Sequence, residues 1–280
     1  MSMTNKIDFA IIIGVNRANP NGDPLNGNRP RTDYDGHGEI SDVCLKRKIR
    51  NRLLDYGEPI LVQSHDYRKD EYNSIKDRFD GNAGAALKKA GGKELVEFAC
   101  KTWFDVRAFG QVLAFKGKKG KDESEAGTSI PIRGPVSIQS AFSREPVVVS
   151  SMQISKSVNL ETKKSNPDGK ASDTMGMKHR VERGIYVTFG SINRQLAEKT
   201  GFTDDDAEIL KTAITRLFEN DESSARPAGS MEVLKVIWWT HTGCVESSAK
   251  VHRSLTVNPD GTYILTPIEG IEAQELDAIC

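Results

Sequence analysis

The chain has few cysteines, and they are not arranged as metal ligands or as a disulfide framework. Among 280 residues there are four, with no CxxC pair between them: Cys44, Cys100, Cys244 and Cys280. Zinc sites and disulfide-stapled folds both need closely spaced or regularly paired cysteines. We therefore expect reduced, mostly structural thiols.

Long hydrophobic runs are also missing. The longest apolar run, Phe9 to Ile13 continuing through Gly14 to Val15, is far below the roughly 20 residues that a membrane span needs. The polar segment before it lacks the small-residue cleavage pattern of a signal peptide. The sequence therefore predicts a cytoplasmic protein with no membrane partner.

There is no excess charge of either sign, since 39 basic residues face 39 acidic ones. Taken alone, this balance argues against nucleic-acid binding, but the charges are unevenly distributed. Residues 41–56 hold five basic and two acidic side chains, 156–183 hold seven and four, and 198–222 hold three and eight. Such segregation favours a basic face for a polyanion and an acidic face elsewhere, an arrangement useful for head-to-tail stacking of copies.

The order of expected elements indicates one α+β domain with insertions. We expect a buried strand over 7–15, a long loop over 16–39, and a helix that starts at the N-cap Ser41 and stops near Tyr56 before Gly57. Residues 57–131 are expected to form a mixed insertion with a Lys/Gly-rich loop over 116–127. Strands at 132–142 and 184–192, a helix at 203–219 and a strand at 233–240 complete a β-α-β-β-α-β order. This is the ferredoxin-like pattern shared with RNA-recognition (RRM-like) domains.

The helix over 41–56 carries cations beside its apolar stripe. At 100° per residue, one face collects four core residues: Leu45, Ile49, Leu53 and Tyr56. Lys46 and Arg50 flank that stripe, with Arg47 just beyond. We expect these cations to hold successive phosphates while the helix N-terminus at Ser41 offers free amides to another. The alternative is an ordinary charged helix face.

The loop before this helix favours the phosphate-binding interpretation. It offers backbone amides, side-chain amides and guanidinium groups on a segment suited to a sugar-phosphate chain: Asn21, Gly22, Asp23, Asn28, Arg29 and Arg31.

These residues also carry a family resemblance. The first strand followed by NPNGDP, RPRTD and ISDVCLKRKIR resembles the start of the CRISPR-associated backbone proteins of the RAMP superfamily. Ser41, Leu45, Lys46 and Arg50 are similar to that superfamily's Ser-then-Leu-Lys-x-x-x-Arg motif. Further blocks resemble the type I-C member in order: WFDVRAFGQVL (103–113), IRGPVSIQSAF (132–142), KHRVERGIYVTFGSIN (178–193) and WWTH.

The resemblance implies a hand-shaped protein: one RRM-like palm domain over 1–280, fingers at 57–131 and a thumb hairpin at 143–183. It implies a crRNA-binding backbone subunit of a type I-C Cascade complex, with neither enzymatic activity nor a cofactor. The implied partners are the CRISPR guide RNA, the target DNA strand paired to it, and further copies of the chain in a helical stack. The crRNA-processing subunit, the large subunit and a recruited nuclease-helicase are implied as well.

The expected thumb contains an alternating segment. Met175, Met177, His179 and Val181 fall on one face of an extended strand, and Lys178 and Arg180 on the other. An apolar face can wedge between bases while a basic face holds phosphate. We therefore expect Met177 and Val181 to wedge the guide, with Lys163, Lys164, Lys178, His179 and Arg180 also contacting RNA. The alternative is that Met and Val pack into a small core.

A metal-dependent RNA endonuclease is the main alternative function. Asp23, Asp33 and Asp35 lie on the loop before the cationic helix, where carboxylates can bind a divalent ion that activates water. No evident general base is paired with them, so we expect no catalytic residue and no metal ligand. Labelled RNA and magnesium would distinguish the two functions.

Overall fold

A long central strand organises the molecule in the computed structural model, which describes residues 2–87, 92–115, 128–155, 175–243 and 245–278. This strand, β1 (Ile7–Ala18), pairs antiparallel with β10 (Met175–Ile192) on one side and β11 (Met231–His241) on the other. They belong to an eight-stranded antiparallel sheet, ordered β14-β11-β1-β10-β8-β4, with β7 and β9 also paired to β10. The remaining bounds are β4 (His37–Ile40), β7 (Val136–Ile138), β8 (Ala141–Pro146), β9 (Val149–Ser155) and β14 (Ile271–Leu276).

Both faces of β1 are buried, which explains its continuous apolar run. Phe9, Ile11 and Ile13 point into the larger core, whereas Ala10 and Ile12 point into a second core on the opposite face. Successive side chains of a strand alternate between the two faces of a sheet, so a strand covered on both sides needs apolar residues at every position.

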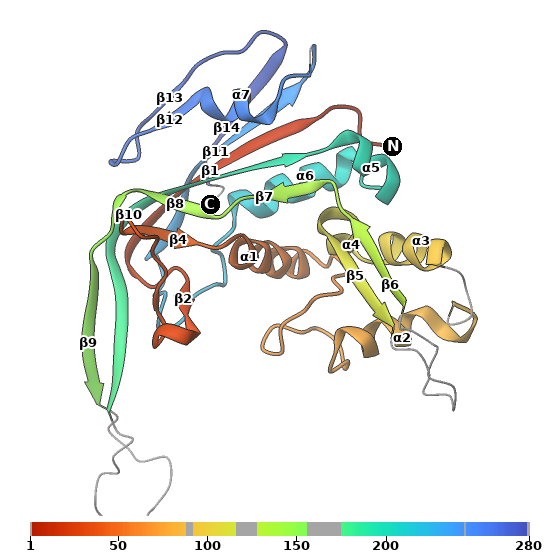
Figure 1. Cartoon of the computed structure of the whole chain (residues 1–280), viewed down its shortest axis with the longest axis horizontal. Helices are drawn as coiled ribbons and strands as arrows, with labels where there is room; N and C mark the ends of the chain where they lie inside the picture. The colour runs from red at the N-terminus through yellow and green to blue at the C-terminus, as the bar shows by residue number, and fades with distance from the viewer. Residues whose placement is uncertain (1, 88–91, 116–127, 156–174, 244, 279–280) are drawn as a thin grey trace, which may run out of the picture.

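Helices cover one face of the sheet and a small appendage covers the other (Figure 1). The first layer includes α1 (Asp42–Asp55), α4 (Phe104–Phe109), α5 (Arg194–Thr200) and α6 (Asp204–Thr215). The opposite layer consists of α7 (Ser248–Arg253), β12 (Leu255–Val257) and β13 (Tyr263–Leu265). Helix α1 agrees closely with its prediction, since Ser41 caps it and Leu45, Ile49 and Leu53 are buried, but Tyr56 at the C-cap is 36 % exposed and does not face the core.

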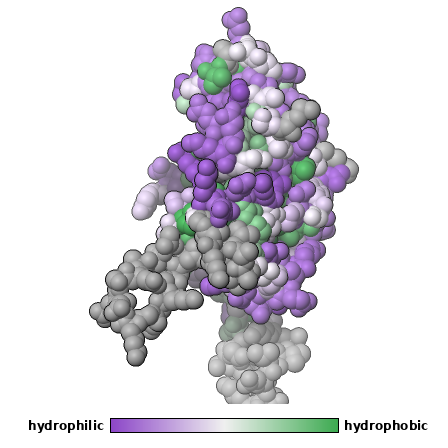
Figure 2. Space-filling view, turned by 90° about the vertical axis from the view of Figure 1, so that its right-hand side faces the viewer, coloured by the Kyte–Doolittle hydropathy of each residue, from purple (hydrophilic) through white to green (hydrophobic). Residues whose placement is uncertain are grey.

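The segment that follows α1 forms a separate lobe with its own core. It contains α2 (Ile75–Leu87), α3 (Gly92–Thr102), β5 (Gly110–Phe115) and β6 (Thr128–Arg133). Leu61, Phe79, Trp103 and Leu113 are buried together there, apart from the sheet. Helix α4 belongs to both parts, since Phe104 lies in the larger core and Val106 in that of the lobe. The predicted Lys/Gly-rich loop at 116–127 lies outside the described residues. Figure 2 shows a mainly hydrophilic surface on this side of the molecule, with hydrophobic residues in small separate spots.

Several elements differ from the sequence-based expectation. The segment expected as a loop over 16–39 carries three short strands: β2 (Gly22–Asp23), β3 (Arg29–Pro30) and β4. The single strand expected over 132–142 is broken into the end of β6, then β7 and β8. Gly134 lies at that break, where an added Cβ would collide with the backbone of residues 108–110. No local pattern in the sequence predicted α5 or the elements after β11.

The start of β10 extends beyond the sheet and forms a two-stranded ribbon with β9 (Figure 1). Met175 pairs with Ser155 at one end and Val181 with Val149 at the other. This ribbon occupies most of the described part of the expected thumb, and Lys163 and Lys164 lie outside the described residues. Within the described ranges, no helix is both long and apolar enough to cross a membrane.

Candidate nucleic-acid interface

The loop predicted to bind phosphate is fastened to the first turn of α1. Asn21 Oδ1 accepts hydrogen bonds from the backbone N of Ser41 at 2.9 Å and from its hydroxyl at 2.8 Å. Ser41 Oγ in turn accepts from the backbone N of Cys44 at 3.3 Å, as an N-cap does. The amides of Ser41 and Cys44 are therefore occupied within the protein. Of the free amides expected at this helix N-terminus, those of Asp42 and Val43 stay a prediction.

A tight turn holds the tip of this loop. At Gly22, a Cβ would collide with the side-chain amide of Asn28 and displace it, so glycine at this position allows the two chain segments to approach closely. Asp23 accepts from the backbone N of Leu25 at 3.2 Å and from Arg31 Nη2 at 3.3 Å. The side chain of Arg31 is still partly exposed, so the turn presents its guanidinium at the surface.

Ser151 joins the loop to the ribbon. Arg29 Nη1 donates to Ser151 Oγ at 3.1 Å, and His179 Nδ1 lies 2.8 Å from the same hydroxyl oxygen. The structure thus brings together Arg29 and His179, two predicted site residues that are 150 positions apart. Ser151 was not predicted, because a serine in a strand gives no local signal of such a role.

The three cations predicted on α1 have different surroundings. Lys46 is part-buried near the surface and pairs with Asp42 at 3.0 Å. Arg47 Nη1 donates to the carbonyl of Val62 at 2.7 Å, and burial together with the charge of Arg50 lowers the pKa of Arg47. Two of the three therefore bind the inserted lobe, because Arg50 is also paired there.

The pairing of Arg50 is the most buried of the three. Its Nε lies 2.9 Å from Asp105 Oδ2, and only 12 % of the arginine side chain is exposed. The guanidinium also lies 5.2 Å from the centre of the Phe109 ring. Lys46, with 25 % of its side chain exposed, is therefore more accessible than Arg50.

The ribbon corrects one prediction about the wedge. Val181 is fully buried in the larger core, so it cannot insert between bases in this conformation. Its partners in the ladder, Ala18 and Val149, belong to the body of the protein. Met177, by contrast, is 55 % exposed, and the apolar surface of the ribbon is completed by Met152, Ile154 and Met175.

Neither face of the ribbon is wholly apolar or wholly basic. Cross-strand partners share a face, so Met177 lies beside Gln153, and Lys178 lies beside Met152. Arg180 shares the second face and pairs with Glu182 at 3.1 Å. Each face thus combines an exposed methionine with polar or basic side chains.

Arg17 is a candidate that the sequence analysis missed. It adopts a left-handed conformation with φ of 52°, in a gap of the β1–β10 register between Asn16 and Ala18. This conformation costs a non-glycine residue about 1–2 kcal/mol. Its side chain is 70 % exposed, and its Nε lies 3.7 Å from Glu182 Oε2. This irregularity in the strand pairing therefore presents a cation next to the ribbon. Nothing in the local sequence singles it out.

Two of the three loop carboxylates considered for a nuclease are engaged in local bonds. Asp33 Oδ1 accepts from the backbone N of Asp35 at 3.0 Å and of His37 at 2.8 Å, and Asp23 is held as described above. Among the described residues, no group of three or more His, Cys, Asp or Glu side chains is positioned to hold a metal ion.

Comparisons with known proteins place the chain beside one family. A family model described as CRISPR-associated protein Cas7 matches residues 5–277. A relative named CRISPR-associated protein Cas7, from Haloferax volcanii, is 31 % identical over 239 residues, covering 82 % of this chain and 68 % of the relative.

Two solved structures are similar in fold. One is titled "CRISPR RNA-guided surveillance complex, pre-nicking"; it is 14 % identical with a TM-score of 0.49, over 88 % of this chain and 81 % of that one. The other, "CRISPR RNA-guided surveillance complex", is 17 % identical with a TM-score of 0.46, over 92 % and 77 % respectively.

Proposed function

This chain belongs to the Cas7 family of CRISPR-associated proteins, and we propose that it is the crRNA-binding backbone subunit of a type I-C Cascade complex. In this proposal the protein has no catalytic activity and polymerises along the guide RNA, supporting its pairing with target DNA. The observation that carries it is the family match over residues 5–277.

The proposed architecture is an RRM-like palm with fingers at 57–131 and a thumb at 143–183. In chain order, β1, α1, β8, β10, α6 and β11 follow the β-α-β-β-α-β sequence of such a palm. The four strands lie side by side in the order β11-β1-β10-β8, with α1 and α6 in contact on one face. These features support the proposal without identifying the ligand.

The proposed guide contacts are centred on the junction of the loop and the ribbon. Arg29, Arg31 and Lys46 would hold phosphates, since each is a cation with at least part of its side chain at the surface. Met177, with Lys178 beside it on the strand, would contact bases and backbone further out on the ribbon.

The proposed partners follow from the same role. They are the guide RNA, the target DNA strand, further copies of this chain, the crRNA-processing and large subunits, and a recruited nuclease-helicase. The proposed compartment is the cytoplasm.

Electron microscopy of the purified protein with a long single-stranded RNA tests the proposal directly. We expect a regular helical coat and intact RNA in the presence of magnesium. Metal-dependent cleavage that disappears in Asp23→Ala would instead favour the endonuclease. Absence of any regular coat would contradict the backbone function.

A variant lacking residues 161–173 tests the proposed contact between neighbouring copies. This stretch is polar and contains glycine, so its removal should leave the melting temperature nearly unchanged. Cooperative coating of long RNA should collapse, because each copy would lose its contact with the next. Cooperative coating equal to that of the parent would contradict the thumb assignment.

A further inference from the structure

A polar cavity in the inserted lobe lies apart from the loop and ribbon just described. It has a volume of about 290 Å³ and lies between the segment 63–73 and the first turn of α2. Its lining includes Gln63, His65, Arg68, Tyr72, Asn73 and Arg78. Among the described residues that line it, none is acidic. The cavity therefore offers hydrogen-bond donors and positive charge, which suits an anionic ligand.

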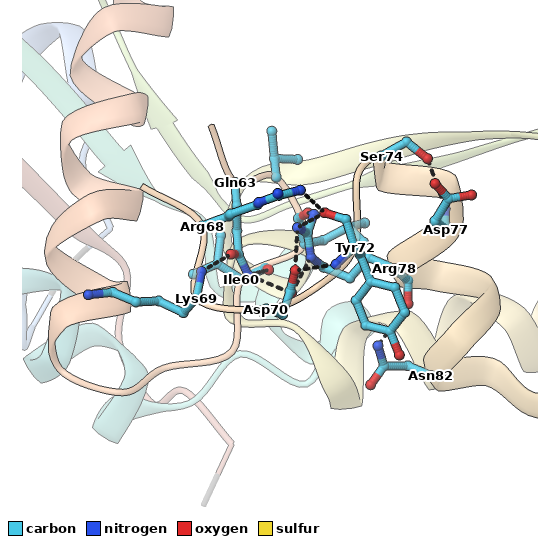
Figure 3. Close-up of polar contacts among 12 residues, drawn as sticks. Ile60, Gln63, Arg68, Lys69, Asp70, Tyr72, Ser74, Asp77, Arg78 and Asn82 are labelled. Carbon is cyan, nitrogen blue, oxygen red and sulfur yellow. Dashed lines mark hydrogen bonds and ion pairs between the residues drawn. The ribbon is translucent and has the colours of Figure 1, made fainter. Parts of the chain in front are cut away.

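Arg78, which lines this cavity, is held in a fixed ion pair by Asp70, which is not itself a lining residue (Figure 3). Arg78 is 3 % exposed, and its Nε and Nη2 lie 2.6 Å and 2.8 Å from the two carboxylate oxygens of Asp70. Asp70 also accepts from the backbone N of Tyr72 at 3.1 Å and from Gln63 Nε2 at 3.3 Å. With four hydrogen bonds, this carboxylate is committed to the walls of the cavity.

A second guanidinium converges on the same place. Arg68 Nη1 donates to the carbonyl oxygen of Tyr72 at 3.1 Å, and Arg78 Nη2 lies 3.5 Å from that same oxygen (Figure 3). Arg68 Nη1 also donates to Asn73 Oδ1 at 2.5 Å. Two cations thus share one neutral acceptor, and of the two guanidinium groups only that of Arg78 pairs with the carboxylate of Asp70. Within the described part of the chain, the charge of Arg68 has no anionic partner in direct contact.

The remaining donors of Arg68 are arranged to receive an oxyanion. Its Nη1 is held by two acceptors, and within the described residues Nε and Nη2 make no hydrogen bond. That free edge is one that binds two oxygens of a phosphate or carboxylate side by side. His65 and Tyr72 add polar groups to the same lining, so a ligand with several acceptor oxygens fits best.

We propose that this cavity is a phosphate-binding site, in which Arg68 contacts the phosphate oxygens and the Asp70–Arg78 pair fixes the base. The phosphate group can come from a free phosphate monoester or from an internal phosphodiester of a single-stranded nucleic acid. The site stands on the geometry of the lobe and does not depend on the proposed guide binding.

The test is a titration of the full chain with inorganic phosphate, with the melting temperature as the readout. Chloride keeps the ionic strength constant. A ligand that binds the folded state raises the melting temperature saturably. We expect Arg68→Gln to weaken the apparent phosphate affinity at least tenfold. Arg68→Lys keeps the charge but loses the planar guanidinium that binds two oxygens at once. Its apparent phosphate affinity should lie between those of Arg68→Gln and the parent.

Lys101→Gln is the matched control, because Lys101 is an exposed cation of the same lobe that pairs with Glu97 on its own helix. It should titrate like the parent. Unfolding of each variant without phosphate shows whether the lobe is intact. If Arg68→Gln is folded and responds to phosphate as Lys101→Gln does, the proposal is wrong.

Two competitors distinguish the sources of the phosphate. Thymidine 5′-monophosphate displaces inorganic phosphate if the site takes a terminal phosphate. An oligothymidylate without terminal phosphates displaces it if the site takes a phosphodiester. Displacement by either competitor in the parent, together with its loss in Arg68→Gln, supports the site. Competition that is equal in the parent and in Arg68→Gln overturns it.

Discussion

Arg50 and Asp105 form a buried ion pair that joins the cationic helix α1 to the inserted lobe. The arginine Nε lies 2.9 Å from the carboxylate of Asp105, which also accepts from the backbone N of Leu61 at 2.8 Å and of Val62 at 3.1 Å. The carboxylate is almost fully buried, and all these bonds cross between elements. Arg50 thus contributes to the architecture of the molecule, whichever ligand the surface binds.

Removal of one partner of this pair should destabilise the protein strongly. Breaking a buried, hydrogen-bonded pair typically costs about 3–5 kcal/mol, because the remaining charge stays buried without a partner. We therefore expect Arg50→Ala and Asp105→Ala each to lower the free energy of unfolding, measured with urea, by about 3 kcal/mol or more. Lys46→Ala should cost less than about 0.5 kcal/mol, since an i,i+4 pair near the surface contributes little. Similar losses for Arg50→Ala and Lys46→Ala would contradict this assignment.

The dependence of RNA affinity on salt should identify the surface cations that hold phosphates. For single strands, the log-log slope is about 0.7 per phosphate contact. The double variant Arg29→Ala with Lys46→Ala should weaken binding to all RNA sequences alike and flatten the slope by about one to two units. Fluorescence anisotropy at several salt concentrations measures it, with Lys101→Gln as the control. A slope unchanged from the parent would remove these residues from the interface.

Substitutions at Met177 and Val181, which lie on the same strand, should have different effects: the first on RNA contact and the second on the stability of the fold. Met177→Ser changes an exposed side chain, so the free energy of unfolding should stay within about 0.5 kcal/mol of the parent. Stacking of a base on the ribbon should weaken, and a regular pattern of chemical reactivity along a bound RNA should become less distinct. Val181→Ala should lower stability by about 1–2 kcal/mol through lost burial. A pattern unaffected by Met177→Ser would exclude this methionine from base contact.

Asp8 should make the stability of the protein depend on pH. Its burial by itself raises the pKa of the carboxyl, but the polar groups of His252, Ser248, His241 and Lys6 around it outweigh this effect and hold the pKa well below the usual range. A carboxyl with a lowered folded-state pKa stabilises the protein above its unfolded pKa of about 3.9 and loses that contribution as pH falls further.

Unfolding free energies at pH 7, 4 and 3 test this relationship. We expect Asp8→Asn to be less stable than the parent at pH 7, and the difference to shrink as the pH falls below about 4. Asp205→Asn, at an exposed position of α6, serves as the control for general charge effects. A difference between Asp8→Asn and the parent that stays constant over this range would contradict the prediction.

The sequence by itself determined the elements whose cause is local. The apolar run at 7–15 became the central strand, because only a position buried on both faces accommodates it. Ser41 and Gly57 bounded α1, since a side-chain cap and a residue with positive φ act within a few positions of the helix ends. The ordered motifs also indicated the family, which the match over 5–277 confirmed.

Only the tertiary structure decided which side chains face solvent. Periodicity placed Arg50 at the edge of the apolar stripe but said nothing of Asp105, 55 positions away, which covers it. Alternation placed Val181 and Met177 on one face of the strand. Strand pairing with Ala18 and Val149 buries Val181, whereas Met177, further along the same strand, stays exposed. Contacts between distant segments set exposure, and local patterns specify a face without specifying what lies against it.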